Sequence, residues 1–157
     1  MTGESSGHVH TLLPGDVVCG DRGECLETLL GSCIAVLLTD ARHTVGAMCH
    51  IVHASEQREG DDKPCAYAAA AIDALYARLV ERGFTPRLCE AYVFGGGNMF
   101  PHLVRGPHIG RRNAESVLAR LQRDGVRVVV QDLGGTCYRR LRWTIGDAAP
   151  ELVSVEV

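Results

Sequence analysis

Two side chains in the first third of the chain, Cys33 and His50, are of types that could perform nucleophilic chemistry together. The thiolate is the reactive form of cysteine, and a free thiol with a pKa of about 8.5 is mostly protonated at neutral pH. A neighbouring imidazole can take that proton, and the resulting imidazolium can later protonate a leaving amine. If the two side chains lie together, they form a nucleophile with its general base and acid.

A β-hairpin is the element that would bring the thiol and the imidazole together. Each lies in an apolar run typical of a buried strand, over residues 33–39 and 45–53, and a short polar turn joins the two runs. If that turn is symmetric about its central bond, Cys33 lies directly opposite His50, with Cβ atoms about 4.5–5.5 Å apart. His43 would lie in the turn, out of reach. The turn sequence is a weak determinant of register, and a slip of one residue would move every side chain to the other face.

Gly31 and Ser32 come directly before the thiol. Glycine lets the backbone approach a substrate closely, and the N–H groups of this segment could hold an oxyanion, which makes Ser32 a candidate substrate-binding residue. The alternative is structural: Cys33 would be a buried thiol that opens a core strand, and His50 a strand histidine with satisfied hydrogen bonds. Residue types and spacing alone leave both interpretations open.

A run of glycines, Gly95, Gly96 and Gly97 followed by Asn98, comes after the predicted strand over residues 88–94. It lacks the G-x-G-x-x-G spacing and the Lys-Ser/Thr pair of nucleotide-binding loops, so we do not expect it to hold phosphate. Glycines in such a position usually allow the chain to pass through a tight turn.

Two helices and further strands complete the predicted architecture. The first helix begins near Pro64 and ends at Gly83. The second begins with Asn113 as its N-cap and ends at Gly125. The further predicted strands cover residues 17–19, 88–94, 126–131 and 152–157. We therefore predict an α+β fold, a sandwich with two main helices on one face of a mainly antiparallel or mixed sheet.

The composition is that of an ordinary globular protein, with 157 residues, 46% hydrophobic and 22% charged. We expect residues 1–10 to be a flexible N-terminal tail and residues 11–157 to form a single domain. The formal net charge of −3 argues against nucleic acid as a partner, because a sequence-independent grip on phosphates needs many cations. No apolar run approaches the roughly 20 residues that span a bilayer, and residues 1–10 lack the features of a signal peptide, so we expect a cytoplasmic protein with no membrane insertion.

The chain contains seven cysteines, an odd number that argues against a disulfide framework. No C-x-x-C pair occurs, and the nearest candidates for a metal site, Cys49 with His50 and His53, would need ligands from elsewhere in the chain. We therefore predict no metal and no cofactor, and expect most of the thiols to be buried as small apolar side chains.

Several segments carry a resemblance to a known family, namely residues 28–36 (TLLGSCIAV), 46–50 (GAMCH), 94–99 (FGGGNM), 109–113 (IGRRN) and 132–135 (DLGG). Over roughly residues 11–145 the chain resembles the CheD family, the chemoreceptor glutamine deamidases of bacterial chemotaxis. The Gly-Ser-Cys motif followed by a histidine 17 positions later is specific in combination, although neither half is specific alone. The resemblance implies an α/β sandwich related to a toxin class of cysteine deamidases.

The resemblance also implies roles for particular residues. Cys33 would be the nucleophile and His50 the base and acid, which together deamidate selected receptor glutamines to glutamates through a thioester. Gly96, Gly97 and Asn98 would form a wall of the substrate cleft. The implied partners are the cytoplasmic helices of chemoreceptors and, in addition, a CheC-type phosphatase.

One position departs from the family pattern. The third catalytic residue of the family is a threonine six positions before the cysteine, where this chain has Glu27, with Thr28 next to it. Thr28 takes the role after a local shift, or the Glu27 carboxylate orients His50 and favours its charged form, or the orienting group is lost and activity is reduced. Thr28 is the candidate we carry forward.

Glu27 therefore keeps a second function open. In that alternative the protein is a catalytically weak binding module of the same fold that docks on chemoreceptors or on a CheC-type phosphatase. A third alternative is an amidohydrolase that acts on a small molecule through its cysteine. Receptor binding that survives Cys33→Ala, without deamidation by the wild type, would favour the binding module over the enzyme.

Overall fold

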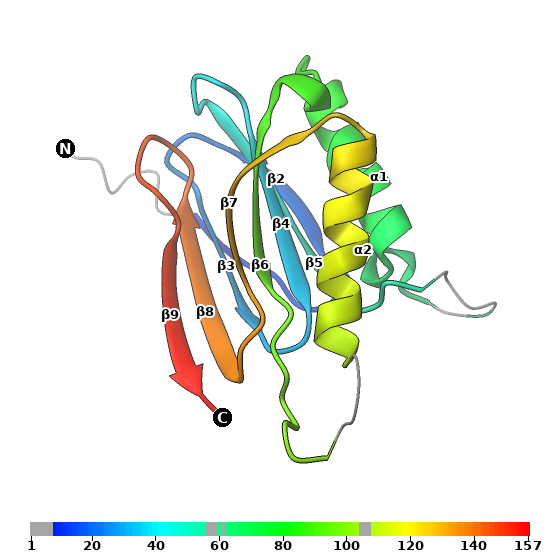
Figure 1. Ribbon diagram of the computed structural model, residues 1–157. Coiled ribbons are helices and arrows are strands. Elements are labelled where there is room, and N and C mark those ends of the chain that lie inside the picture. The colour runs from blue at the N-terminus through cyan, green and yellow to red at the C-terminus, as the bar shows by residue number, and fades with distance from the viewer. Residues whose placement is uncertain (1–7, 56–59, 61, 104–107) are drawn as a thin grey trace.

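The computed structural model describes residues 8–55, 60, 62–103 and 108–157. The chain forms three layers, a four-stranded sheet, a five-stranded sheet and a pair of helices (Figure 1). Within the described ranges, no helix is long and apolar enough to cross a membrane.

The five-stranded sheet is the central layer, with strand order β2-β5-β4-β6-β7. Its strands are β2 (Val17–Asp21), β5 (Val45–Ile51), β4 (Ile34–Thr39), β6 (Glu90–Gly95) and β7 (Arg127–Leu133). Neighbours β6 and β7 run parallel, and the other neighbouring strands run antiparallel. The sheet is therefore mixed, and the β4–β5 hairpin lies at its centre.

The four-stranded sheet packs on one face of the central layer, with strand order β1-β3-β8-β9. Its strands are β1 (Val9–Thr11), β3 (Cys25–Leu30), β8 (Cys137–Thr144) and β9 (Glu151–Glu156). β1 pairs with β3 in parallel, and the other pairs are antiparallel. Part of the segment predicted to be a tail, Val9 and His10, thus belongs to a strand, whereas residues 1–7 lie outside the described residues.

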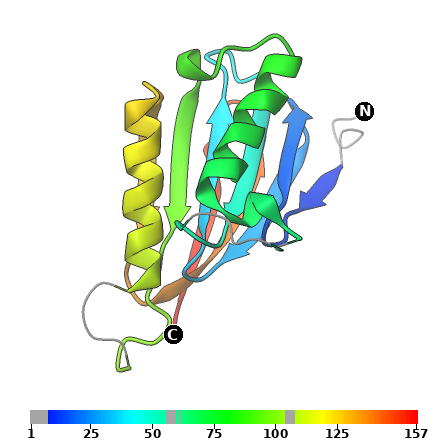
Figure 2. The ribbon, with the colours of Figure 1, turned by 90° about the vertical axis from the view of Figure 1, so that its right-hand side faces the viewer.

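Both long helices, α1 (Ala68–Glu81) and α2 (Ile109–Arg123), cover the other face of the central sheet (Figure 2). Two short 3-10 helices, η2 (Pro64–Ala66) and η3 (Pro86–Leu88), come before α1 and before β6. The prediction of an α+β fold with two main helices on one face is confirmed. The division of the strands between two sheets adds a layer that the sequence did not predict.

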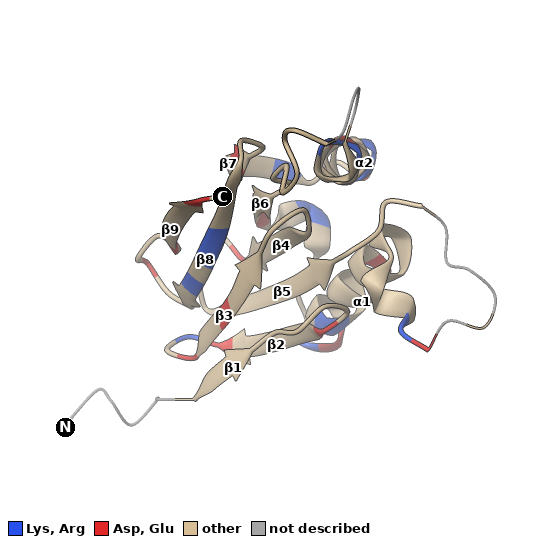
Figure 3. Cartoon of the chain, turned by 90° about the horizontal axis from the view of Figure 1, so that it is seen from below, with Lys and Arg blue, Asp and Glu red and all other residues tan. Residues whose placement is uncertain are grey.

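The three layers enclose two apolar cores, one on each face of the β4–β5 hairpin. Val36 and Cys49 face the helices, whereas Leu37 and Met48 face the four-stranded sheet. Because both faces are covered, β4 and β5 are buried at every position, which explains why their sequences are continuously apolar. Figure 3 shows both strands free of Lys, Arg, Asp and Glu, between outer elements that carry these residues.

The predicted start of the second helix is wrong. α2 begins at Ile109, and the side chain of its N-cap, His108, accepts a hydrogen bond from the Arg111 backbone N–H at 3.2 Å. Asn113 therefore lies inside the first two turns and is only 1% exposed. A side chain buried on the inner face of a helix cannot serve as its cap, so the polar group of Asn113 must have another partner.

The predicted register of the hairpin is also wrong. His50 lies opposite Ala35 rather than Cys33, and Thr39 lies opposite Gly46. The loop over residues 40–44 is not symmetric, because the Asp40 carboxylate accepts hydrogen bonds from the Thr44 and Val45 backbone N–H groups at 2.7 and 3.0 Å. The register differs from the predicted one by two residues. An even shift leaves the facing of each side chain unchanged, so Cys33 and His50 still point to the same side of the sheet.

Candidate active site

Cys33 lies at the entrance to β4, after the turn formed by Gly31 and Ser32. Its side chain is partly buried against the core between the two sheets. Burial raises the pKa of the Cys33 thiol above its ordinary value, so the thiol is protonated at neutral pH. The residue is partly exposed, and its side chain is a thiol rather than a thiolate when the protein is at rest.

His50 points from β5 into the space between the two sheets, where it meets Thr28 of β3. The side chain of His50 is buried, with 3% of the residue exposed, and its Nδ1 lies 2.7 Å from Thr28 Oγ1. The Thr28 hydroxyl donates its one hydrogen to the backbone carbonyl of Leu12 at 2.7 Å. Thr28 Oγ1 can therefore only accept from the ring, so the proton of the neutral imidazole is on Nδ1 and the lone pair is on Nε2.

The second ring nitrogen of His50 is buried and has no hydrogen-bond partner within the described part of the chain. Burial lowers the pKa of His50 to about 4, and the charge of Asp16 opposes that shift only in part. At neutral pH the site therefore holds an uncharged imidazole with one ring nitrogen that is free to accept a proton.

Glu27 and Thr28, the two candidates for orienting His50, point in opposite directions because they are neighbours on a strand. Thr28 is buried and faces the central sheet, whereas the Glu27 carboxylate accepts a hydrogen bond from Thr11 Oγ1 at 2.9 Å on the exposed side. The hydroxyl of Thr28 is the group that contacts His50.

The glycine loop after β6 braces the turn that carries the thiol. Gly97 N–H donates to the Gly31 carbonyl at 3.0 Å, and Gly96 N–H donates to the Cys33 carbonyl at 2.9 Å. A side chain at Gly95 would collide with the Cys33 carbonyl, and Gly95 has a φ of +118°. Glycine is therefore required for the loop to approach the turn so closely.

The substrate-binding candidates are not all placed alike around Cys33. Gly96 and Gly97 contact the turn directly, and Ser32 is part of it. Asn98 lies further along the loop, where its side chain accepts a hydrogen bond from the Phe100 backbone N–H at 3.1 Å. The side chain of Asn98 thus stabilises its own loop.

Three residues outside the predicted set of site residues also contact this turn. A Cβ atom added to Gly31 would lie 3.0 Å from Met99 Sδ and 3.5 Å from Tyr138 Cε1, so these two side chains border it. Asn113 Nδ2 donates to the Ser32 carbonyl at 3.2 Å. The signal for Asn113 was present in the sequence, because it shares the inner face of its helix with Val117.

The other thiols differ from Cys33 in their surroundings, and all seven cysteines are free. Cys49 directly precedes His50 in the sequence, but its side chain faces the helices. Burial raises the pKa of the Cys49 thiol to about 12. Among the residues that the structure describes, no three His, Cys, Asp or Glu side chains gather closely enough to hold a metal ion.

An α+β sandwich that carries a partly exposed cysteine and a threonine-bound histidine has the groups of a cysteine hydrolase. The chain belongs to the CheD family, because its residues 52–149 match the model of that family, which is described as CheD chemotactic sensory transduction.

Three curated relatives, each named probable chemoreceptor glutamine deamidase CheD, agree with the family match. The protein from Methanococcus vannielii is 34% identical over 85% of this chain and 86% of its own length. The protein from Pseudomonas syringae pv. syringae is 31% identical over 85% of this chain and 77% of its own. The protein from Stenotrophomonas maltophilia K279a is 34% identical over 90% of this chain and 70% of its own. A crystal structure from Neisseria meningitidis, 17% identical with a TM-score of 0.43 over 77% of this chain and 52% of its own, is too distant to indicate a function.

Proposed function

We propose that this protein is a cysteine-dependent deamidase that converts glutamine side chains of chemoreceptors to glutamate. Family membership and the names of the relatives support the reaction and the class of substrate. The observation that carries the proposal for this chain is the hydrogen-bond series from His50 through Thr28 to the Leu12 carbonyl. It leaves an uncharged imidazole with a free Nε2 on the same face of the sheet as Cys33.

The first half of the reaction forms a thioester. His50 Nε2 takes the proton of the Cys33 thiol while the sulfur attacks the carboxamide carbon of the glutamine. Backbone N–H groups of the Gly31–Cys33 turn hold the oxygen as it becomes negatively charged. The intermediate then collapses, the carbon–nitrogen bond breaks, and the imidazolium gives its proton to the departing nitrogen, which leaves as ammonia.

The second half of the reaction hydrolyses the thioester. With ammonia gone, His50 is again neutral and removes a proton from a water molecule that attacks the thioester carbon. The carbon–sulfur bond breaks, and the proton held by His50 returns to the sulfur. One glutamine and one water thus give one glutamate and one ammonia, and the thiol is regenerated.

Both groups are uncharged before the substrate arrives, because burial disfavours the thiolate and the imidazolium alike. The proton therefore moves only as the sulfur attacks, rather than in a preformed ion pair. In the observed register His50 lies opposite Ala35, two residues beyond Cys33, so the imidazole is diagonal to the thiol across the hairpin. The distance between the Cys33 sulfur and His50 Nε2 must shorten when substrate binds, as hydrogen-bond distances at active sites often do.

Chemoreceptor helices are the proposed substrate, and a CheC-type phosphatase is a proposed second partner on the strength of family membership. The observation that kept a catalytically weak binding module open was Glu27 at the position of the family threonine. That reason loses its force, because the Thr28 hydroxyl meets His50 and the Glu27 carboxylate faces the other side of its strand.

The experiment is incubation of the protein with a receptor cytoplasmic fragment that contains glutamine. We expect each modified site to gain about one mass unit with release of one ammonia. Cys33→Ala should show no gain, whereas Cys65→Ala, which changes a partly buried thiol beside α1, should act like the wild type. A folded wild-type protein that leaves the fragment unmodified would contradict the proposal.

A further inference from the structure

Asn113 makes an unusual set of contacts for a side chain on the inner face of a helix. Its Nδ2 donates to two backbone carbonyls, those of Ser32 at 3.2 Å and Val52 at 2.9 Å. The orientation of the amide is fixed, because the reverse orientation would place its oxygen against both carbonyl oxygens. Its Oδ1 is buried and finds no partner among the described residues. A buried amide that is only half paired costs stability, so the contacts that Nδ2 makes call for an explanation.

The two carbonyls lie where the strands of the hairpin separate. Ser32 is the residue before the thiol, and Val52 follows Ile51, the last residue of β5 and the neighbour of His50. One amide therefore ties the segment that carries the nucleophile to the end of the strand that carries the base. It does so from α2, on the face of the central sheet opposite to His50.

Holding the Ser32 carbonyl also orients the next N–H group. In a trans peptide the C=O and the following N–H point in opposite directions, and no cis peptide bond occurs among the described residues. Because the Ser32 carbonyl points toward Asn113 of α2, the Cys33 N–H points away from that side chain. The carbonyls on either side, of Gly31 and Cys33, are held by Gly97 and Gly96, and the Cys33 N–H itself donates to no acceptor in the described part of the chain.

We propose that Asn113 is a positioning residue for the deamidation, in that it aims the Cys33 backbone N–H at the oxygen that becomes negatively charged in the transition state. The inference rests on the proposed function. Asn113 does not touch the substrate and acts through the Ser32–Cys33 peptide. Without the hydrogen bond from Asn113 to the Ser32 carbonyl this peptide can rotate, and an oxyanion donor that is not held in place stabilises the transition state poorly.

A comparison of two reactions of the same thiol separates this role from general support of the fold. Deamidation passes through an oxyanion, whereas alkylation by iodoacetamide displaces iodide from carbon and forms none. We expect Asn113→Leu, which keeps the size of the side chain and removes its donors, to lower kcat about 10²–10³-fold. KM for deamidation should remain within about twofold of the wild-type value. The rate of Cys33 alkylation, measured across the same range of pH, should also remain within about twofold.

Asn113→Asp serves as the second variant if Asn113→Leu does not fold, because it keeps the shape and its ionised carboxylate cannot donate to the Ser32 carbonyl. Ser116→Ala, a partly exposed position on the same helix, is the matched control and should leave both reactions unchanged. Parallel losses of deamidation and alkylation, or no loss of either, would overturn the proposal for Asn113. Absence of deamidation by the wild type would instead contradict the proposed function.

Discussion

The β4–β5 hairpin carries a histidine near each end, and their surroundings shift the two pKa values in opposite directions. His50 lies between the sheets, where burial lowers its pKa to about 4. His43 lies in the connecting loop with a φ of +56°, and its surroundings raise its pKa. The same side chain thus becomes an uncharged base at one end and a favoured cation at the other. The difference shows that the environment of a histidine, rather than its residue type, decides which of its two protonation states is favoured.

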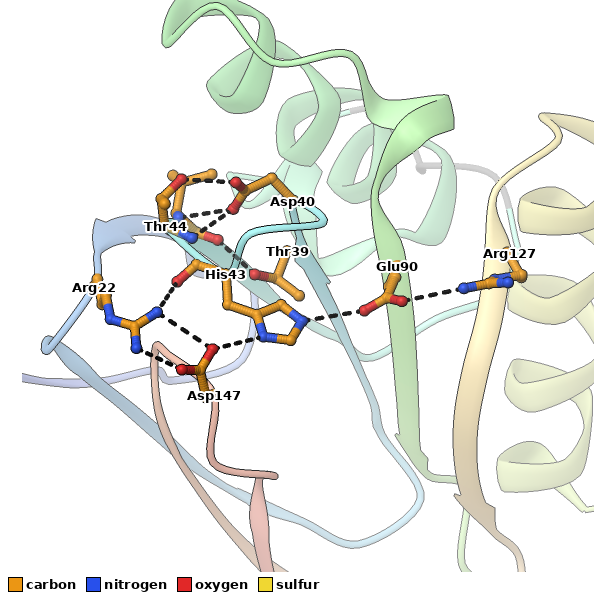
Figure 4. A network of polar contacts seen from close by, with 9 residues as sticks. Arg22, Thr39, Asp40, His43, Thr44, Glu90, Arg127 and Asp147 are labelled. Carbon is orange, nitrogen blue, oxygen red and sulfur yellow. Dashed lines mark hydrogen bonds and ion pairs between the residues drawn. The ribbon is translucent and has the colours of Figure 1, made fainter.

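The surroundings of His43 are a network of exposed and partly exposed charged side chains (Figure 4). Its Nε2 lies 3.2 Å from Glu90 and its Nδ1 lies 3.3 Å from Asp147, and the hydrogen bond with Glu90 is the largest cause of the raised pKa. Arg22 pairs with Asp147 at 2.7 Å, and Arg127 pairs with Glu90 at 3.1 Å. Both carboxylates are therefore shared with arginines. The network joins the hairpin loop to neighbouring elements and leaves neither ring nitrogen free.

Replacing each of the two histidines in turn by glutamine should give the largest difference in kcat. General acid–base catalysis contributes about 10²–10⁴-fold, so His50→Gln should lower kcat by that factor. His43→Gln should leave kcat within about twofold of the wild type. The folds of both variants are first checked by circular dichroism. Ammonia release from a receptor fragment then gives kcat for each variant. Equal activities of the two variants would remove the distinction between the two ends.

Two threonines provide a finer test, because each donates a buried hydroxyl to a carbonyl at 2.7 Å: Thr28 to Leu12, and Thr39 to Val45. Valine removes either hydroxyl with little change in shape, at a cost of about 1–3 kcal/mol in the free energy of unfolding. We expect Thr28→Val to lower kcat about 10–100-fold as well, because the His50 ring loses the partner that fixes its proton.

Thr39→Val is the matched control, since it lies at the other end of the hairpin. It should lower the urea midpoint to a similar extent without lowering kcat. A loss of kcat in both variants would mean that the hydroxyl of Thr28 matters only for stability.

The smallest expected effect is on stability at the His43 end. A histidine whose pKa is higher in the folded state contributes stability that is fully present below the unfolded pKa of about 6.5 and is lost as pH rises through the folded pKa. His43→Gln should therefore cost under about 1 kcal/mol at pH 5.5, as is usual for partly exposed pairs, and less at pH 8.5. Urea unfolding at both pH values measures the difference. A larger cost at pH 8.5 than at pH 5.5 would contradict the raised pKa.

Much of the candidate site could be predicted from local patterns. Alternation along a strand has a period of two, so Cys33 and His50 were placed on one face correctly even though the register differed by two residues. The register itself depended on the side chain of Asp40, which accepts hydrogen bonds from two backbone N–H groups of the loop. Such a loop cannot be told from its length and composition alone.

Other features depend on contacts between segments far apart in the chain. The choice between Glu27 and Thr28 required β3, a strand that the sequence did not predict, and the second sheet to which it belongs. The contact of Asn113 with Ser32 spans 81 positions, and an N-cap placed five residues late made a buried side chain look like a cap. Periodicity indicates which face of its element a residue occupies, but not which distant residue it contacts there.

The central claim is that His50 is a neutral imidazole with its proton on Nδ1 and a free Nε2 before substrate binds. Nitrogen-15 NMR of the histidine rings measures both properties in the free protein. For His50 we predict a protonated Nδ1 and an unprotonated Nε2 at pH 7, with a titration midpoint of about 4. A proton on Nε2 at pH 7, or a midpoint near the ordinary value of about 6.5, would contradict the account.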